Sequence, residues 1–404
     1  MQLRLTEEQT LIESSVLSLL AGEYDFQRRQ RSLQAPDACN PQLWARFASL
    51  GWLAFALPAR VGGLACGALA TGLLMQAFGR HLVVEPYHAC VLLATRLLAE
   101  LGTATQCDRW LPALTGGRMR AALAHEELAN PSPWSARLTT AVRRNGQWEL
   151  RGRKHLVVGA PGAALLLVSA SVGAATGGTP GQRVFLVAPD APGVLLRPAL
   201  LSDGAHAADL ELQSVRIGDN AILGEDADVA QGLSTLYAQG VVASCWEASG
   251  AMRAVHEQTV AYTQRRIQFA QPLSKFQVVA HRLAEMAVEC AEAQAACELA
   301  ALRLERGEPD TPALASMAKS KVGRAARFVA QQAVQLHGAM GVSEELPVAS
   351  YFRKLTAFAQ QAGATAWHSH HYGTAMLACD AWRSSRSLPD LEHQVHAEAP
   401  EVSA

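Results

Sequence analysis

The sequence predicts an α+β protein in which a helical region, a run of β-strands and a second helical region follow one another along the chain. Apolar residues recur at helical spacing near the start, short segments of branched residues fill the middle, and long helical patterns return after them. From the glycines that separate these patterns we expect domains at 1–117, 118–224 and 225–385, followed by a tail at 386–404.

The composition argues against several classes of function. The 404 residues include 35 Lys and Arg and 36 Asp and Glu, so a net charge of −1 indicates no basic surface for nucleic acid. The uncharged stretch between His155 and Gln182 contains an apolar part, 163–168, that is far too short to span a bilayer. The eight cysteines form no Cys-x-x-Cys pair, and the opening MQLRLTEEQT does not resemble a signal peptide. We therefore expect a cytoplasmic protein with reduced thiols and no membrane segment.

Helices are predicted throughout the N-terminal region. Thr6 precedes acidic residues as a helix N-cap does, and apolar residues then recur at Leu11, Ile12, Val16, Leu19 and Leu20. Further helical patterns occupy 69–78, 91–101 and 106–114, and Gly116 and Gly117 follow the last of them.

Strands are predicted in the middle region, at 137–142, 147–150, 164–168, 183–187, 194–197 and 209–212. Turn pairs such as Asn145-Gly146 and Pro192-Gly193 separate them. Because no helical pattern intervenes, these strands predict a small barrel or sandwich, which ends near 218–224.

Three long helices are predicted after the strands. The first covers 229–266 and carries a stripe of small residues that would let another helix approach closely. The second begins at Ser274, with Gln277 at capping-box spacing, and the third begins at Thr311 and ends at Gly338. Together these patterns predict a helical bundle after the strands.

The connection within 262–286 carries polar groups that invite a functional interpretation. Arg265 and Arg266 are expected on the last turn of one helix, and Phe269 and Gln277 follow within a short distance along the chain. A purely structural interpretation is that the arginines interact favourably with the negative end of the helix dipole, Phe269 fills the core and Gln277 caps its own helix.

Two segments resemble the signatures of the acyl-CoA dehydrogenase family. In YTQRRIQFAQPLSKFQ (262–277), a Tyr is followed by an Arg, a Phe-small-x-Pro turn and a Phe-Gln pair. In QLHGAMGVSEELPVASYFR (335–353), a Gln precedes glycines, an acidic-x-Pro-Val step and an Arg. The resemblance covers nearly the whole chain, and it is closest to small subunits of pimeloyl-CoA dehydrogenase-like heteromeric enzymes.

This resemblance implies three domains, of which the last is a four-helix bundle, FAD as cofactor, and oxidation of a CoA thioester to the trans-2-enoyl-CoA. The reaction belongs to β-oxidation, in the catabolism of fatty acids or of steroid side chains. In the family, residues at the matching positions contact the FAD of a neighbouring subunit. The implied cofactor-binding residues are Arg266, Phe269, Phe276, Gln277, Gln335, Gly338, Ala339 and Gly341, where Ala339 replaces one of the family's paired glycines.

The resemblance also implies that a carboxylate should remove the α-proton, and here it is missing. Most relatives place a Glu where this chain has Ala362, and others place it within the segment matching 237–241, which contains no acid. Losing a general base typically costs about 10²- to 10⁴-fold in rate. Flavin-contacting positions of the middle domain differ as well: Glu126 to Pro131 replace a Thr-Glu-Pro-Gly run, and Leu156 to Val158 replace Trp-Ile-Thr.

The leading hypothesis is therefore a subunit without the catalytic Glu. The resemblance implies that it pairs with a Glu-bearing acyl-CoA dehydrogenase chain as a heterotetramer and passes electrons to electron-transfer flavoprotein. One alternative is an autonomous dehydrogenase with a relocated base at Glu126, Glu247 or Asp203, although a solvated carboxylate is expected at Glu126. Another is a non-catalytic module that binds CoA esters or proteins.

No metal site is expected. His125-Glu126-Glu127 begins like a zinc-binding helix, but Ala129 stands where a second ligand is needed. The late histidines His368, His370 and His371 are poorly spaced for one helix face, and a packed or solvated cluster is the expected state.

Overall fold

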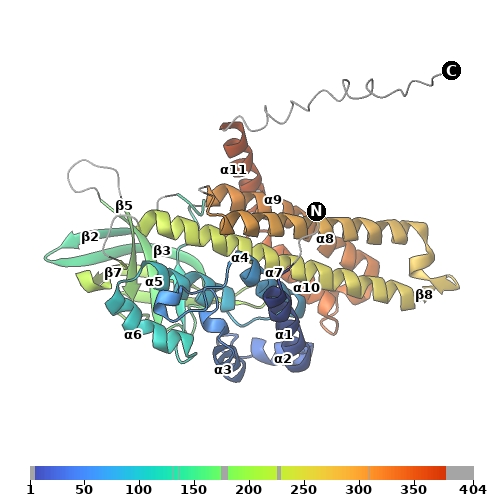
Figure 1. Ribbon diagram of the computed structural model, residues 1–404, viewed down its shortest axis with the longest axis horizontal. Helices are drawn as coiled ribbons and strands as arrows, with labels where there is room; N and C mark the ends of the chain where they lie inside the picture. The colour runs from blue at the N-terminus through green and yellow to red at the C-terminus, as the bar shows by residue number, and fades with distance from the viewer. Residues whose placement is uncertain are drawn as a thin grey trace, which may run out of the picture.

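A computed structural model describes residues 5–130, 132–135, 137–173, 181–224, 229–308 and 310–378. Helices, then a sheet, then helices follow one another along the chain (Figure 1), so the predicted α+β class is confirmed. The predicted tail at 386–404 lies outside the described residues, and the domain boundaries remain a prediction. Within these ranges no helix is both long and apolar enough to cross a bilayer.

The N-terminal region is helical, as predicted. Thr6 caps the first helix by accepting a hydrogen bond from the Gln9 amide, and the Gln9 side chain bonds back to the Thr6 amide. The elements are α1 (Glu7–Glu23), α2 (Phe26–Leu33), α3 (Pro41–Ser49), η1 (Trp52–Ala54), η2 (Ala59–Val61), α4 (Ala68–His81), η3 (His88–Thr95), α5 (Arg96–Leu101) and α6 (Ala104–Thr115).

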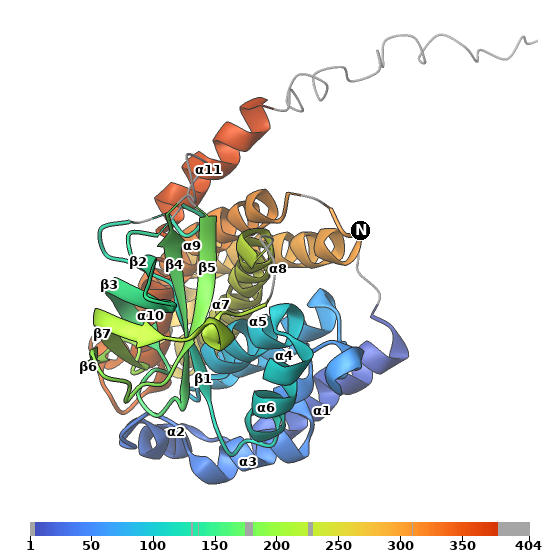
Figure 2. The same ribbon diagram turned by 90° about the vertical axis from the view of Figure 1, so that its left-hand side faces the viewer.

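The middle region forms one seven-stranded curled sheet in the order β1-β4-β2-β3-β7-β6, with β5 paired to β4. Both β1 and β2 pair in parallel with β4, and the remaining pairs are antiparallel. In Figure 2 the sheet stands beside the N-terminal helices, and the C-terminal helices lie behind both. The strands are β1 (Ala121–Ala124), β2 (Thr140–Arg144), β3 (Gln147–Val158), β4 (Leu165–Val172), β5 (Gly181–Val187), β6 (Val194–Leu200) and β7 (His206–Ile217).

Long helices return after η4 (Asp219–Ala221) and form the bundle. The longest, α7, runs from the sheet to the opposite end of the molecule (Figure 1). The elements are α7 (Val229–Arg265), β8 (Ile267–Gln268), β9 (Gln271–Pro272), η5 (Leu273–Lys275), α8 (Gln277–Glu305), α9 (Thr311–His337), η6 (Gly338–Val342), α10 (Pro347–Phe358) and α11 (Thr365–Ala378).

The backbones of α4 and α7 touch through glycines. A methyl group on Gly250 would lie 1.9 Å from the carbonyl oxygen of Gln76, and one on Gly79 would lie 1.8 Å from that of Glu247. Gly72 in turn leaves room for the indole of Trp246, which is almost fully buried. The two helices therefore pack at a distance that only glycine permits.

Three predicted element ends differ from the structure. Ser274 does not cap α8, because it lies in η5 and the helix begins at Gln277 after Phe276. Helix α7 ends at Arg265, so Arg266 is the first residue beyond it. Asp310, and not Thr311, is the N-cap of α9, since its carboxylate accepts from the Ala313 amide.

We predict that Gly250→Ala destabilises the protein, because its methyl group would force α4 and α7 apart. Overpacking of this kind typically costs about 1–3 kcal/mol. Gly373→Ala is the matched control, since Gly373 also lies within a helix, α11, and has nothing within 4 Å of an added methyl group. Urea unfolding would measure both. A Gly250→Ala protein as stable as the control would contradict the close approach.

Candidate active site

A cavity of about 480 Å³ lies where the N-terminal helices, the sheet and the bundle meet. Its lining is largely apolar, with contributions from Phe78, Leu93, Leu156, Val157 and Phe358. Charged side chains also line it, including all three acids considered as relocated bases: Glu126, Asp203 and Glu247.

Ala362 lines this cavity and contributes a methyl group, which cannot accept a proton. Ala362 has a φ of 54° and Gly363 a φ of 93°, both in the left-handed region. The carbonyl of Ala362 accepts a hydrogen bond from Nε2 of His368 at 2.8 Å, and Nδ1 of that ring contacts the Ser316 hydroxyl at 2.9 Å. Burial lowers the pKa of His368 to about 4, so the ring is neutral and its role here is to hold the turn.

Glu126 is half-buried and accepts a short hydrogen bond from the hydroxyl of Tyr237 on α7. The expectation of a solvated carboxylate at this position is therefore wrong, because Tyr237 and the cavity wall replace much of its water. The ring of Tyr237 lies 4.8 Å from that of His125. Burial raises the pKa of the Tyr237 phenol, with Glu126 acting in the same direction, so the phenol stays protonated and donates.

The other two acids are in different situations. Glu247 forms an ion pair with Lys354 of α10 at 2.6 Å, which neutralises its charge. Asp203, in the turn between β6 and β7, is buried and accepts a hydrogen bond from the Ala205 amide at 3.1 Å. The segment that follows Glu126 reaches the turn at Ala362: Pro133 packs against Gly363, and its carbonyl accepts a hydrogen bond from His125.

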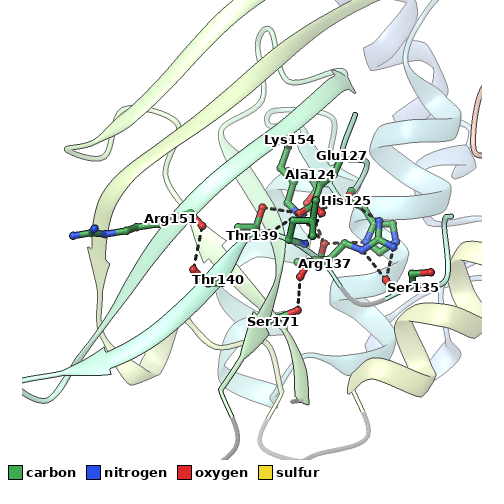
Figure 3. Close-up of polar contacts among 12 residues, drawn as sticks. Ala124, His125, Glu127, Ser135, Arg137, Thr139, Thr140, Arg151, Lys154 and Ser171 are labelled. Carbon is green, nitrogen blue, oxygen red and sulfur yellow. Dashed lines mark hydrogen bonds and ion pairs between the residues drawn. The ribbon is translucent and has the colours of Figure 1, made fainter. Parts of the chain in front are cut away.

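A buried ion pair fixes the segment that carries Glu126. Lys154 on β3 contacts Glu127 at 2.7 Å, and both side chains are almost completely buried (Figure 3). Glu127 also accepts hydrogen bonds from the backbone amides of Leu138 and Thr139. Burial alone would raise the pKa of the Glu127 carboxyl, but Lys154 and these hydrogen bonds lower it to about 2. Burial lowers the pKa of Lys154 to about 8, against the pull of Glu127.

Further polar contacts complete this network. His125 is bonded through Nε2 to the Pro133 carbonyl at 2.8 Å and through Nδ1 to Ser169 at 2.9 Å. Arg137 donates from Nε to the Ser135 carbonyl at 2.9 Å, and the carbonyl of Arg137 accepts from Ser171 (Figure 3). In this chain the backbone donors at 138 and 139 are thus used internally. Pro131 lies outside the described residues.

A second site lies at the other end of α7 and brings together residues from both family-like signatures. A cavity of about 460 Å³ is lined by Arg265, Arg266 and Tyr262 of the first and by His337 and Leu346 of the second. We call this region, with the adjoining hairpin, the distal corner. Among the described residues neither arginine forms an ion pair, so both charges are free for a ligand.

Exposure of the predicted cofactor-binding residues is uneven at the distal corner. Phe269 is 87% exposed at the tip of the hairpin, where it and Ala270 have φ values of 54° and 62°. It does not fill the core, so the purely structural interpretation is wrong for this residue. Its ring centroid lies 6.1 Å from that of Phe276. Gln277, Gln335, Gly338 and Ala339 are exposed, whereas Gly341 is buried.

The chemistry of the distal corner fits the pyrophosphate and adenine of FAD. Two uncompensated guanidinium groups suit a diphosphate, and Phe269 offers an open aromatic face. Gly338 ends α9 with a φ of 60° and has nothing within 4 Å of an added methyl group, so its backbone is open to a ligand.

Sequence reasoning missed several cavity residues. Tyr237 was considered only as part of a segment without acids, and Lys354 lies just beyond the second signature and gave no signal. Arg29 on α2 gave no signal, because it lies in a charged, strongly polar helix that resembles a solvated one. Within the described ranges no three His, Cys, Asp or Glu side chains gather as a metal site requires, and His368 is buried against Ser316.

We predict that Lys154→Met destabilises the protein by about 3–5 kcal/mol, because Glu127 would remain as a buried, unpaired carboxylate. The double variant Lys154→Met/Glu127→Gln should lose less, since the amide can still accept from 138 and 139. Glu127 has a lowered pKa, so its stabilising contribution is present above the unfolded value and lost as the pH falls toward about 2. The difference in free energy of unfolding between wild type and Lys154→Met, measured by urea unfolding, should therefore become smaller in acid. If the stability losses from Lys154→Met and Glu127→Gln simply added in the double variant, this would argue against the ion pair.

Three family models match the chain in order: the acyl-CoA dehydrogenase N-terminal domain at 6–118, middle domain at 127–215 and C-terminal domain at 235–377. The acyl-CoA dehydrogenase FadE12 of Mycobacterium tuberculosis is 29% identical over 356 residues, covering 85% of this chain and 89% of that protein. The solved steroid ACAD Tcur3481–Tcur3483, a G363A variant, is 28% identical, with a TM-score of 0.83 over 93% of this chain and 99% of that one. The ChsE4–ChsE5 complex of M. tuberculosis, 24% identical over 94% of this chain and 99% of that one, shares the fold with a TM-score of 0.83. The chain belongs to the acyl-CoA dehydrogenase family, whose members are flavin-dependent oxidoreductases that use FAD and act on the CH–CH bond of acyl-CoA.

Proposed function

We propose that this chain is the subunit without the catalytic Glu in a heteromeric, FAD-dependent acyl-CoA dehydrogenase that forms trans-2-enoyl-CoA. The observation that carries the proposal is the separation of the cavity at Ala362 from the distal corner by the length of α7. From Tyr237 to Arg265 the unbroken helix rises about 40 Å, which is more than an extended FAD molecule can span. Arg266 therefore serves the flavin of another chain.

The two ends of this chain have different roles in the proposal. The distal corner contributes Arg266, Phe269, Phe276, Gln277, Gln335 and the loop from Gly338 to Gly341 to the flavin of the partner, which when bound accepts the hydride. The partner supplies the carboxylate that takes the α-proton, because Ala362 has no group that can hold one. The cavity of this chain keeps an apolar wall for an acyl group.

Exposed apolar side chains on α8 support an association with a second chain. Val278, Val288 and Leu299 are each about half exposed or more and lie along one helix that starts at the distal corner. Exposing an apolar stripe of a helix to water is unfavourable, and packing against a helix of a partner chain would bury that stripe. The similar steroid ACAD is named for two proteins, Tcur3481 and Tcur3483. We propose that the partner of this chain is a Glu-bearing dehydrogenase chain and that the two form a heterotetramer. Electron-transfer flavoprotein is the proposed acceptor of the electrons, and the cytoplasm the proposed location.

Arg266→Met should weaken FAD binding by about 10- to 100-fold in the assembly, because it removes a charge-assisted contact to the pyrophosphate. Arg144→Met is the control, since Arg144 is equally exposed but lies on β2, away from the distal corner. Flavin absorbance per protein after dialysis measures the effect. Equal flavin retention in both variants would refute the role of Arg266.

An autonomous dehydrogenase with a relocated base is the second candidate, and the position of Glu126 favours it. Glu126 lines the same cavity as Ala362, whereas Glu247 is held in an ion pair with Lys354. A binding module that does not use flavin is the third candidate, and failure of every assembly of this chain to retain flavin would favour it.

If Glu126 is the base, the isolated chain should reduce a dye with an acyl-CoA, and Glu126→Gln should lower kcat by about 10²- to 10⁴-fold. Tyr237→Phe, which keeps the carboxylate but removes its hydrogen bond, should lower it less. Glu247→Gln and Asp203→Asn are the comparison variants for the other two acids. Our leading proposal instead expects no turnover by the isolated chain, so activity that depends on Glu126 would replace it with this second candidate.

A further inference from the structure

Two neighbouring side chains on one wall of the central cavity each leave an acceptor atom unused. Glu126, in the segment after β1, and His155, near the end of β3, both line this cavity. The amide of His155 donates to the carbonyl of Glu126 at 2.9 Å, so the two side chains leave the wall from adjacent backbone positions. We call Glu126 and His155 the wall pair.

His155 is oriented by Asp209 of β7. Its Nδ1 contacts Oδ1 of Asp209 at 2.8 Å. Because a carboxylate can only accept, Nδ1 carries the hydrogen, and the lone pair of the neutral ring lies on Nε2. Nε2 has no hydrogen-bond partner within the described structure and keeps accessible surface, and the side chain as a whole is 33% exposed.

Glu126 is oriented in a similar way by Tyr237 of α7. Its Oε1 accepts the hydrogen bond from the Tyr237 hydroxyl. Its Oε2 has no partner among the described residues and also keeps accessible surface. The wall pair therefore presents two acceptors side by side, and each is fixed from behind by a residue of another element.

A structural role accounts for Asp209 but not for His155. Oδ1 of Asp209 also accepts from the Leu156 amide at 2.9 Å, and Leu156 has a φ of 47° where the pairing of β3 with β7 is irregular. Asp209 could hold this irregular backbone without an imidazole beside it. The structural role does not explain why the ring lines the cavity with a free lone pair.

We propose that the wall pair binds a water molecule and adds it across the double bond of a trans-2-enoyl-CoA, which gives the 3-hydroxyacyl-CoA. A water molecule has two hydrogens, so it can donate one to Nε2 of His155 and the other to Oε2 of Glu126. Its lone pairs are then free to attack a ligand in the cavity. This inference rests on the proposed function, because the dehydrogenase assembly is the source of the enoyl-CoA.

The addition needs no oxidant or reductant. His155 takes a proton from the water through Nε2 while the water oxygen forms its bond to the β-carbon, and the π electron pair of the double bond moves to the α-carbon. The imidazolium, which Asp209 stabilises, then gives the proton to the α-carbon. One water is consumed and both residues return to their starting state. Because both act from one wall, the hydroxyl and the hydrogen should add to the same face.

Hydration would be measured on the purified full chain, alone and with its partner chain, using a series of trans-2-enoyl-CoA esters and no electron acceptor. We expect the absorbance of the conjugated thioester to fall and a product heavier by one water to form, with syn addition of deuterium in heavy water. His155→Gln should lower kcat by about 10²- to 10⁴-fold with little change in KM. Glu126→Gln should lower it at least about tenfold, because the charge that holds the water is lost.

His370→Gln is the control, since His370 is an exposed histidine of α11 that does not line the cavity. No hydration by wild type, or hydration that His155→Gln leaves unchanged, would overturn the inference. Release of the free CoA thiol instead of the hydroxy ester would overturn it too, because the water would then attack the thioester carbonyl. If His155→Gln does not fold, as judged by circular dichroism, Glu126→Gln decides, since it must lower kcat. None of these results bears on the proposed function, which flavin retention and dehydrogenation by the assembly test separately.

Discussion

The contact between α4 and α7 is the constraint on which the rest of the molecule depends. Gly79 and Gly250 let the two backbones touch, and no other residue type would fit at either position. This fixes α7, and a single helix then determines where Tyr237, Glu247 and Arg266 lie relative to one another. Because α7 is unbroken, the residues beside the central cavity and those of the distal corner cannot approach within one protomer. Helix geometry thus separates the two sites within one protomer, and Ala362 leaves the central cavity without a carboxylate at that position.

Buried charges shape the central cavity in two different ways. The Lys154–Glu127 pair is compensated and bonded to backbone amides, so its main effect is to fix one conformation of the segment after β1. Because neighbouring residues of an extended chain point in opposite directions, anchoring Glu127 in the interior turns Glu126 toward the cavity. Arg29, by contrast, donates to neutral acceptors, the Ser350 hydroxyl and the Asp203 carbonyl, and its guanidinium lies 5.8 Å from the centroid of the Phe26 ring.

Much of the fold could be predicted from sequence, because helices and strands follow from the spacing of apolar residues. Thr6 with Gln9, and Gly338 at the end of α9, behave as their local patterns indicate. Strand β1 was missed because four residues, AALA, give no alternation, and it is held by pairing with β4, a long-range contact. The hairpin after α7 was missed because Phe269 and Ala270 adopt positive φ, where glycine or asparagine would have given a turn signal. The site was less predictable. The distal corner could be located because its residues are close in sequence, whereas Arg29, Glu85 and Lys354 meet only through tertiary packing.

The stoichiometry of the native assembly tests the central claim most directly. Native mass spectrometry of this chain, purified with a Glu-bearing dehydrogenase chain and alone, would give the subunit composition and the flavin content together. The account predicts a mixed assembly that holds flavin and turns over, and a lone chain that does not retain flavin fully and shows no dehydrogenase turnover. A homo-oligomer of this chain with one FAD in every protomer and full turnover would contradict it.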